Sequence, residues 1–315
     1  MMHKEKHCGK RCGKSCYEIN GELRIAVSLI ALVLFYGLLS AMPAFAQEPV
    51  APVTDTLPAR ASDQASGDKT DEPEFIVPSR PTISNPAEFQ KPGVLQLEYG
   101  YDANFRADDF RTMQRTPLAL RFAISRRFLF EVDNDNLISQ TPIEGTRETG
   151  VGDTRLGLQG VAVHETPDHP ALAFAYYIKL PSASVAKNLG TGRVDHSLIT
   201  LVSKKISKTT IDFNAIYLLA GRQNQNGYAS SGQAALALSR NVSEKFGVQG
   251  ELSGQSRNDE QTGAIFALGA VTYQLNRRAI FDAGMRAGLT PDAPRYGVFA
   301  GVTFGVADFY SSKKH

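Results

Sequence analysis

Extended stretches of alternating polarity run through residues 94–304, and they restrict the possible folds more than any other feature of this 315-residue chain. A clear example has Phe128 and Phe130 on one parity and Glu131 and Asp133 on the other. Successive side chains of a strand point to opposite faces, whereas a helix repeats every 3.6 residues and cannot produce this separation. The sequence therefore predicts strands with one apolar face and one polar face.

The strands are long enough to cross a membrane. Residues 94–304 divide into about twelve segments of roughly nine to eleven residues, the length that a tilted strand needs to span a bilayer. Three of them, around residues 199–202, 234–238 and 264–273, show weaker alternation, but their lengths and flanking turns still fit strands. Long polar loops, such as 103–114, 134–150 and 182–194, alternate with short turns, such as Ser207-Lys208. This asymmetry is typical of outer-membrane barrels, whose short turns lie in the periplasm.

Closure of the sheet follows from the membrane environment. No water is available in the hydrocarbon layer to pair with the backbone groups of an open sheet edge. We therefore predict an all-β fold: a single up-and-down antiparallel transmembrane β-barrel of about 12 strands over residues 93–310. The alternative is a soluble β-sandwich or lipocalin-like barrel with its apolar face inward. Against it, the polar parity is crowded with small residues such as Gly152 and Gly157, and aromatic residues lie near many strand ends.

The N-terminus has the features of a secretory signal peptide. Basic residues precede an apolar run at 25–41, and Ala44-Phe45-Ala46 then offers small residues for cleavage between Ala46 and Gln47. An uncleaved membrane anchor is the alternative, which Pro43 disfavours. Residues 1–46 are thus predicted to direct export to the outer membrane of a Gram-negative bacterium.

The three cysteines, Cys8, Cys12 and Cys16, all lie in this leader, so the mature chain has neither disulfides nor a thiol nucleophile. The leader also holds six of the 34 basic and three of the 32 acidic residues, which leaves 28 and 29. A nearly neutral mature chain gives no indication of nucleic-acid binding.

Residues 47–92 are rich in Pro, Ala, Ser, Thr and Asp. Such a segment cannot bury enough apolar surface to offset the entropy lost on ordering, so it is predicted to be a disordered periplasmic tail. One apolar run, Phe75-Ile76-Val77, could dock at the barrel mouth.

Charged residues on the polar parity are the candidates for the barrel lumen. A barrel of this size leaves a narrow, partly wet interior. Both signs of charge occur, so the set fits either a wall held by ion pairs or a path for small solutes. The candidates are Glu98, Arg121, Glu131, Asp133, Asp153, Arg155, Lys179, Asp212, Glu251, Asp282 and Arg286.

Two groups of residues resemble catalytic or metal sites, but neither is expected to act as one. The cluster from His164 to His169 lacks the helix that zinc motifs of this kind require, because prolines interrupt it. Asp195, His196 and Ser197 are neighbours on a strand, so their side chains cannot converge. We expect no catalytic residues, no metal and no cofactor.

Short glycine-containing motifs support a family resemblance. They occupy residues 150–159, 179–182 with 189–195 and 202–205, and 281–284 with 296–304. In these segments the chain resembles the outer-membrane transporters named for the meta-cleavage pathway of phenol degradation. The resemblance implies an outer-membrane barrel associated with uptake of hydrophobic or aromatic compounds. The expected partners are outer-membrane lipid and a small-molecule solute.

The predicted function is therefore a passive channel or transporter and not an enzyme. A structural or adhesive barrel is the second possibility, and a lipid-modifying enzyme embedded in the barrel is the third. The oligomeric state stays open at this point.

Overall fold

The computed structural model describes residues 74–107, 110–223, 226–258 and 262–310. The predicted signal peptide, its cleavage site and residues 47–73 lie outside this part of the chain. Within it, no helix has the length and apolar character needed to cross a membrane.

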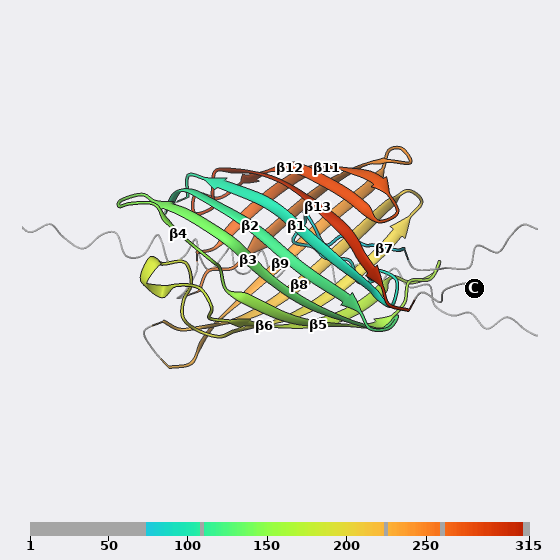
Figure 1. Ribbon diagram of the computed structural model, residues 1–315, viewed down its shortest axis with the longest axis horizontal. Helices are drawn as coiled ribbons and strands as arrows, with labels where there is room; N and C mark the ends of the chain where they lie inside the picture. The colour runs from blue at the N-terminus through green and yellow to red at the C-terminus, as the bar shows by residue number, and fades with distance from the viewer. Residues whose placement is uncertain (1–73, 108–109, 224–225, 259–261, 311–315) are drawn as a thin grey trace, which may run out of the picture. The chain divides into compact units, whose positions relative to one another are not determined.

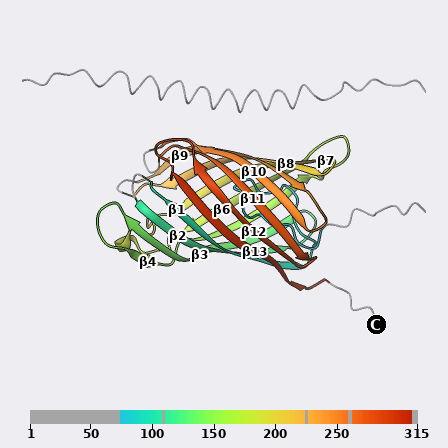
Figure 2. The same ribbon diagram turned by 90° about the horizontal axis from the view of Figure 1, so that it is seen from above.

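The chain forms one antiparallel sheet that closes on itself (Figures 1 and 2). Each strand pairs with its neighbours in sequence, and β1 pairs with β13 on one side and β2 on the other. A short strand, β4, pairs only with the far end of β3, so the wall itself has the predicted number of strands. A single turn of 3-10 helix, η1, spans Val185–Lys187. The strands are β1 (Val94–Phe105), β2 (Phe110–Ala123), β3 (Phe128–Pro142), β4 (Glu148–Gly150), β5 (Thr154–Val163), β6 (Ala171–Leu180), β7 (Asp195–Ile206), β8 (Thr209–Gly221), β9 (Tyr228–Asn241), β10 (Phe246–Gln255), β11 (Ala264–Asn276), β12 (Ala279–Gly288) and β13 (Tyr296–Asp308).

The predicted alternation is confirmed along the wall. Phe128 and Phe130 are exposed on the outer face, whereas Leu129 and Glu131, which alternate with them, are buried inside. The segments with weak alternation are also strands, within β7, β9 and β11. An apolar outer face around a partly polar interior is the arrangement expected of a barrel in lipid.

Two predicted loops contain more strand than the sequence indicated. The prediction of a loop at residues 103–114 is wrong for most of its length, because β1 continues to Phe105 and β2 begins at Phe110. Likewise, β3 runs through most of the predicted loop 134–150 and then pairs with β4. Polar and apolar residues mix on both faces of these extensions, as the exposed Leu137 and the buried Ile138 show, so the alternation that identifies a membrane-spanning strand is lost where the backbone ladder continues.

The prediction of disorder across residues 47–92 is wrong for residues 74–92. This segment, called the plug below, lies inside the barrel, where Ile76, Ala87, Phe89 and Gln90 are almost completely buried. Its backbone groups pair with inward side chains of the wall. The plug therefore needs no hydrophobic core of its own, which is the step that its composition could not reveal.

Candidate functional site

The plug begins on the inner face of β1. Val77 N–H donates to Gln96 Oε1 at 2.9 Å, and Gln96 Nε2 donates back to Val77 O at 2.9 Å. Two residues further along the strand, the Glu98 carboxylate accepts from Ser79 N–H, the Ser79 hydroxyl and Arg80 N–H at 2.9, 2.8 and 3.1 Å. Two adjacent inward residues of β1 thus hold the incoming chain by its backbone, in a manner independent of plug side chains other than Ser79.

A fully buried arginine supports this attachment from behind. Arg121 Nη1 lies 3.2 Å from Glu98 Oε1, and Arg121 Nε lies 3.1 Å from Glu131 Oε2. Arg121 Nη1 also donates to Val77 O at 2.8 Å, so the same guanidinium binds wall and plug. The Tyr177 hydroxyl donates to Glu131 Oε2. Buried charges are tolerated when they are paired and hydrogen-bonded, and Arg121 meets this requirement through Nε and Nη1, while its buried Nη2 makes no hydrogen bond with a described residue.

Arg80 occupies a recess made by the absence of side chains. Gly100 and Gly301 are paired across β1 and β13, and Asp282 of β12 is the next partner of Gly301. A Cβ atom at Gly100 would overlap with Arg80 Cζ. The guanidinium lies 3.3 Å from Asp282 Oδ1 and donates to the Ala300 carbonyl oxygen. The two glycines therefore make room for a cation that Asp282 neutralises.

The plug then crosses to the opposite wall. Ser84 N–H donates to Glu251 Oε2 at 2.7 Å, and the Ser84 hydroxyl donates to the Asp212 carbonyl oxygen. Asn85 and Asn214 exchange two hydrogen bonds of 2.8 Å each. With these contacts the plug is attached to β8 and β10 as well as to β1, β12 and β13, and so it spans the lumen.

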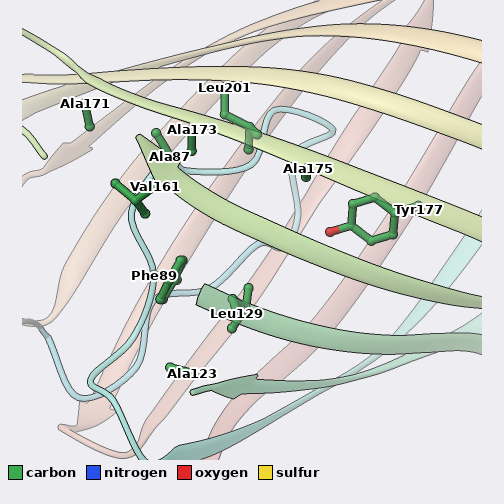
Figure 3. Close-up of a cluster of buried hydrophobic side chains, with 10 residues drawn as sticks. All are labelled: Ala87, Phe89, Ala123, Leu129, Val161, Ala171, Ala173, Ala175, Tyr177 and Leu201. Atoms are coloured by element: carbon green, nitrogen blue, oxygen red, sulfur yellow. The ribbon is translucent and has the colours of Figure 1, made fainter. Parts of the chain in front are cut away.

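An apolar cluster fixes the end of the plug at the rim of short turns. Ala87 and Phe89 pack with Ala123, Leu129, Val161, Ala171, Ala173, Ala175, Tyr177 and Leu201 (Figure 3). Three inward residues of β6 in this cluster, Ala171, Ala173 and Ala175, are alanines, which leave the width that Phe89 needs. Ala87 N–H also donates to Ser203 Oγ on β7. Outside the cluster, Lys91 Nζ pairs with Asp308 Oδ2 at 2.8 Å.

Above the plug, toward the rim of long loops, the interior carries ion pairs of a different kind. Arg155 Nε lies 2.7 Å from Asp133 Oδ1, and half of the Arg155 side chain is exposed. Lys179 Nζ bridges Asp153 and Asp195. These side chains are paired with each other and not with the described residues of the plug, and we call this region the vestibule. On the neighbouring wall, the Asp102 carboxylate binds both Arg115 and Arg286.

The structure divides the predicted lumen residues into two groups. The first group contacts the plug or supports the residues that do: Glu98, Arg121, Glu131, Asp212, Glu251 and Asp282. Those in the vestibule are Asp133, Asp153, Arg155, Lys179 and Arg286. Their inward position follows the strand parity, and a role in permeation stays a prediction.

Sequence reasoning missed the plug residues themselves, above all Arg80, Ser84 and Phe89, and their wall partner Ser203. One signal was available. The inward parity of β6 and of β13 is composed largely of alanine and glycine, and such residues leave an interior volume that some other segment must fill.

The two groups set aside as catalytic or metal sites lie apart from any such arrangement. His164 follows β5 in the turn to β6, where its ring pairs with Glu88, and Glu165 pairs with Lys204. Asp195 points into the vestibule, while His196 contacts the outward residue Tyr176, so the two neighbours face opposite sides as predicted. Among the described residues, no group of His, Cys, Asp and Glu could hold a metal ion.

Comparison with solved structures shows the same fold in an outer membrane channel from Pseudomonas putida F1. The two chains share 13% sequence identity and a TM-score of 0.56, and the match covers 69% of this chain and 97% of the other. A NanC porin matches with 9% identity and a TM-score of 0.45, covering 67% of this chain and 98% of that one. The CymD monoaromatic hydrocarbon channel matches with 10% identity and a TM-score of 0.40, covering 68% and 88%. The TM-scores of the last two matches are below 0.5, so these two structures are similar to this chain only in a general way.

No curated protein sequence matches the chain. A family model does match, over residues 78–306, which is most of the chain. The match includes the plug from residue 78 onward and nearly the whole barrel. This agrees with the resemblance seen in the sequence motifs. The chain belongs to the family described as "Putative MetA-pathway of phenol degradation".

Proposed function

We propose that this protein is a passive outer-membrane channel for small solutes, including aromatic compounds, and that the plug sets the width of its pathway. One observation carries the proposal. The interior holds exposed ionic side chains in the vestibule, such as Arg155, and is crossed below by a segment attached largely through hydrogen bonds.

The polar interior favours a pathway over a purely structural barrel. Replacing buried ion pairs by well-packed apolar residues is often neutral or stabilising, so a barrel that only anchors loops gains little from them. A polar lumen is instead the usual interior of barrels that conduct water and solutes. The Arg121 cluster and the vestibule pairs fit that use.

The chemical class of the solute rests on the family and on the vestibule. The family description refers to phenol degradation. In the vestibule, Arg155 lies over the Tyr177 ring, with its Cζ 5.4 Å from the ring centroid, and Arg286 lies over Phe299 at 5.9 Å. Guanidinium groups interact favourably with the face of a small aromatic molecule, as these two arginines do with the buried Tyr177 and Phe299 rings. These contacts support small aromatic solutes bearing a polar group.

Planar bilayer recording tests the proposal. We expect the mature chain to give small conductance steps, and a variant lacking residues 74–92 to give larger ones. Since removal of the plug exposes Arg121 and Glu98, each preparation is first checked for a closed barrel by its gel mobility before and after boiling. A second variant, Ser84→Ala with Asn85→Ala, weakens the plug without removing it and should give an intermediate conductance.

Phenol added to the bath should block or shift these steps, whereas glycerol at the same concentration should not. Folded preparations of all three proteins that never conduct would contradict the channel. Conduction unaffected by phenol would contradict the aromatic solute alone.

A second candidate, an adhesive barrel, has one supporting observation. Leu137, Ile143 and Val151 are exposed apolar side chains on and around the β3–β4 hairpin. This hairpin lies at the rim of long loops, which faces the outside of the cell in barrels of this type. Shortening it should reduce cell adhesion and leave conductance unchanged if the candidate is correct.

A further inference from the structure

Three side chains on the outer face of the barrel form a hydrogen-bonded chain that the channel function does not use. They are Tyr176 of β6, His196 of β7 and Tyr228 of β9. The Tyr176 hydroxyl lies 2.6 Å from His196 Nδ1, and His196 Nε2 lies 3.2 Å from the Tyr228 hydroxyl. The rings also pack, with centroid distances of 6.0 and 5.4 Å.

The Tyr228 ring reaches His196 across an intervening strand. Tyr228 and His196 lie on strands that are separated by β8, whose last residue, Gly221, is the register partner of Tyr228. Arg193 packs against Gly221, where a Cβ atom would lie 2.7 Å from Arg193 Cβ and from the Val194 carbonyl oxygen. All of these residues lie at the ends of strands that lead into the long loops, which is the level of the outer aromatic girdle in barrels of this kind.

The chain leaves a hydrogen-bond donor pointing away from the histidine. A neutral imidazole has one N–H donor and one acceptor nitrogen. One tyrosine hydroxyl therefore accepts the imidazole proton, and that hydroxyl retains its own hydrogen for another acceptor. The position is unusual for polar groups, because their neighbours Phe174 and Leu198 are more than half exposed on the lipid-facing side.

A cavity adjoins Tyr228 and has two arginines in its lining. Its wall includes Arg193, Gly221, Arg222 and Tyr228. Arg193 Nη2 donates to the Gln223 carbonyl oxygen. The nearby carboxylate of Asp195 is bound by Lys179 and by Gly221 N–H, which hold it at the vestibule. The described hydrogen bond of Arg193 goes to a neutral carbonyl oxygen, so its guanidinium brings a positive charge to the cavity.

We propose that this cavity and the Tyr176-His196-Tyr228 chain bind the phosphorylated headgroup of a glycolipid in the outer leaflet. Arginine binds phosphate oxygens through several parallel N–H groups, and the free tyrosine hydroxyl can donate to another phosphate oxygen. The acyl chains of the same lipid would lie on Phe174 and Leu198. This combination of a cationic cavity above an apolar wall favours an anionic amphiphile over free phosphate.

Native mass spectrometry of the mature protein with lipid A tests the proposal. We expect bisphosphorylated lipid A to bind at least about tenfold more tightly than the same lipid with its phosphates removed, because dephosphorylation removes the charged acceptors of these hydrogen bonds. The variant Arg193→Gln with Arg222→Gln should lose this preference, and His196→Phe should reduce it. Arg240→Gln is the matched control, since Arg240 lies at the opposite rim, where it donates to Thr209.

Inorganic phosphate supplies the remaining comparison. An excess that does not displace bisphosphorylated lipid A supports a lipid site, whereas full displacement shows an anion site without lipid preference and overturns the proposal. Equal binding of both lipids would also overturn it, as would unchanged binding by the double arginine variant. Because conductance is not a readout here, these outcomes are separate from those that test the channel.

Discussion

The Arg80 guanidinium lies in the space that a side chain at Gly301 would occupy. A Cβ atom built at Gly301 would be 2.5 Å from Arg80 Nε, and one at Gly305 would be 2.6 Å from Phe75 Cε1. Phe75 is itself held by Arg278, whose Cζ lies 4.4 Å from the ring centroid. The glycines of β13 therefore shape the recess that receives the first half of the plug.

Gly301→Leu should displace Arg80 from Asp282 and loosen the plug. The side chain of leucine cannot share the recess with the guanidinium, and overpacking of this kind costs about 1–3 kcal/mol. We expect a larger single-channel conductance in planar bilayers. Gly232→Leu is the control, since a Cβ atom there meets nothing within 4 Å. Equal conductance of the two variants would show that the Arg80 contact does not hold the plug.

Glu98→Ala should destabilise the barrel as well as release the plug. The substitution leaves Arg121 with only one of its two carboxylate partners and removes the acceptor for Ser79 and Arg80. Breaking a buried ion pair costs about 3–5 kcal/mol. Urea unfolding in lipid vesicles measures the loss, with Glu144→Ala as a control on an exposed loop residue. A loss as small as that of the control would contradict the arrangement around Arg121.

Ser84→Cys reports directly on the plug. No cysteine follows Cys16 in the sequence, so the mature chain would carry one thiol. Since Ser84 is 1% exposed, a maleimide should react at least about tenfold more slowly there than at a cysteine replacing the exposed Leu137. Adding Gly301→Leu should accelerate labelling of Ser84→Cys. Rapid labelling in the single variant would contradict a plug that fills the lumen.

The wall of this barrel could be predicted from sequence, because the membrane imposes a strict alternation that residues such as Phe128, Leu129 and Phe130 display. The same parity placed Glu98, Arg121 and Asp282 inside. It could not reveal that these groups bind residues 74–92. A Pro-rich segment has too few apolar residues to order itself, and composition does not show that its N–H groups meet Glu98, Asn214 and Glu251 in the folded chain.

Cleavage after Ala46 stays a prediction. The small residues Ala44 and Ala46 both precede the predicted site. We expect the protein purified from outer membranes to begin at Gln47, which intact mass and N-terminal sequencing would establish. Ala46→Arg should block processing and retain the precursor. An N-terminus upstream of residue 25 in purified outer membranes would contradict a cleaved leader.

Arginine substitutions on the outer face test whether the wall contacts lipid. Leu252 lies within β10 and is 55% exposed, while Leu275 lies next to the end of β11 and is 49% exposed. A charge facing the bilayer centre costs about 2–4 kcal/mol in such barrels, and about 0–1 kcal/mol near the interface. Leu252→Arg should therefore destabilise the barrel folded into vesicles much more than Leu275→Arg. A wall in water would tolerate both changes equally, because neither leucine is buried by the protein itself, so equal small effects would contradict a membrane-spanning barrel.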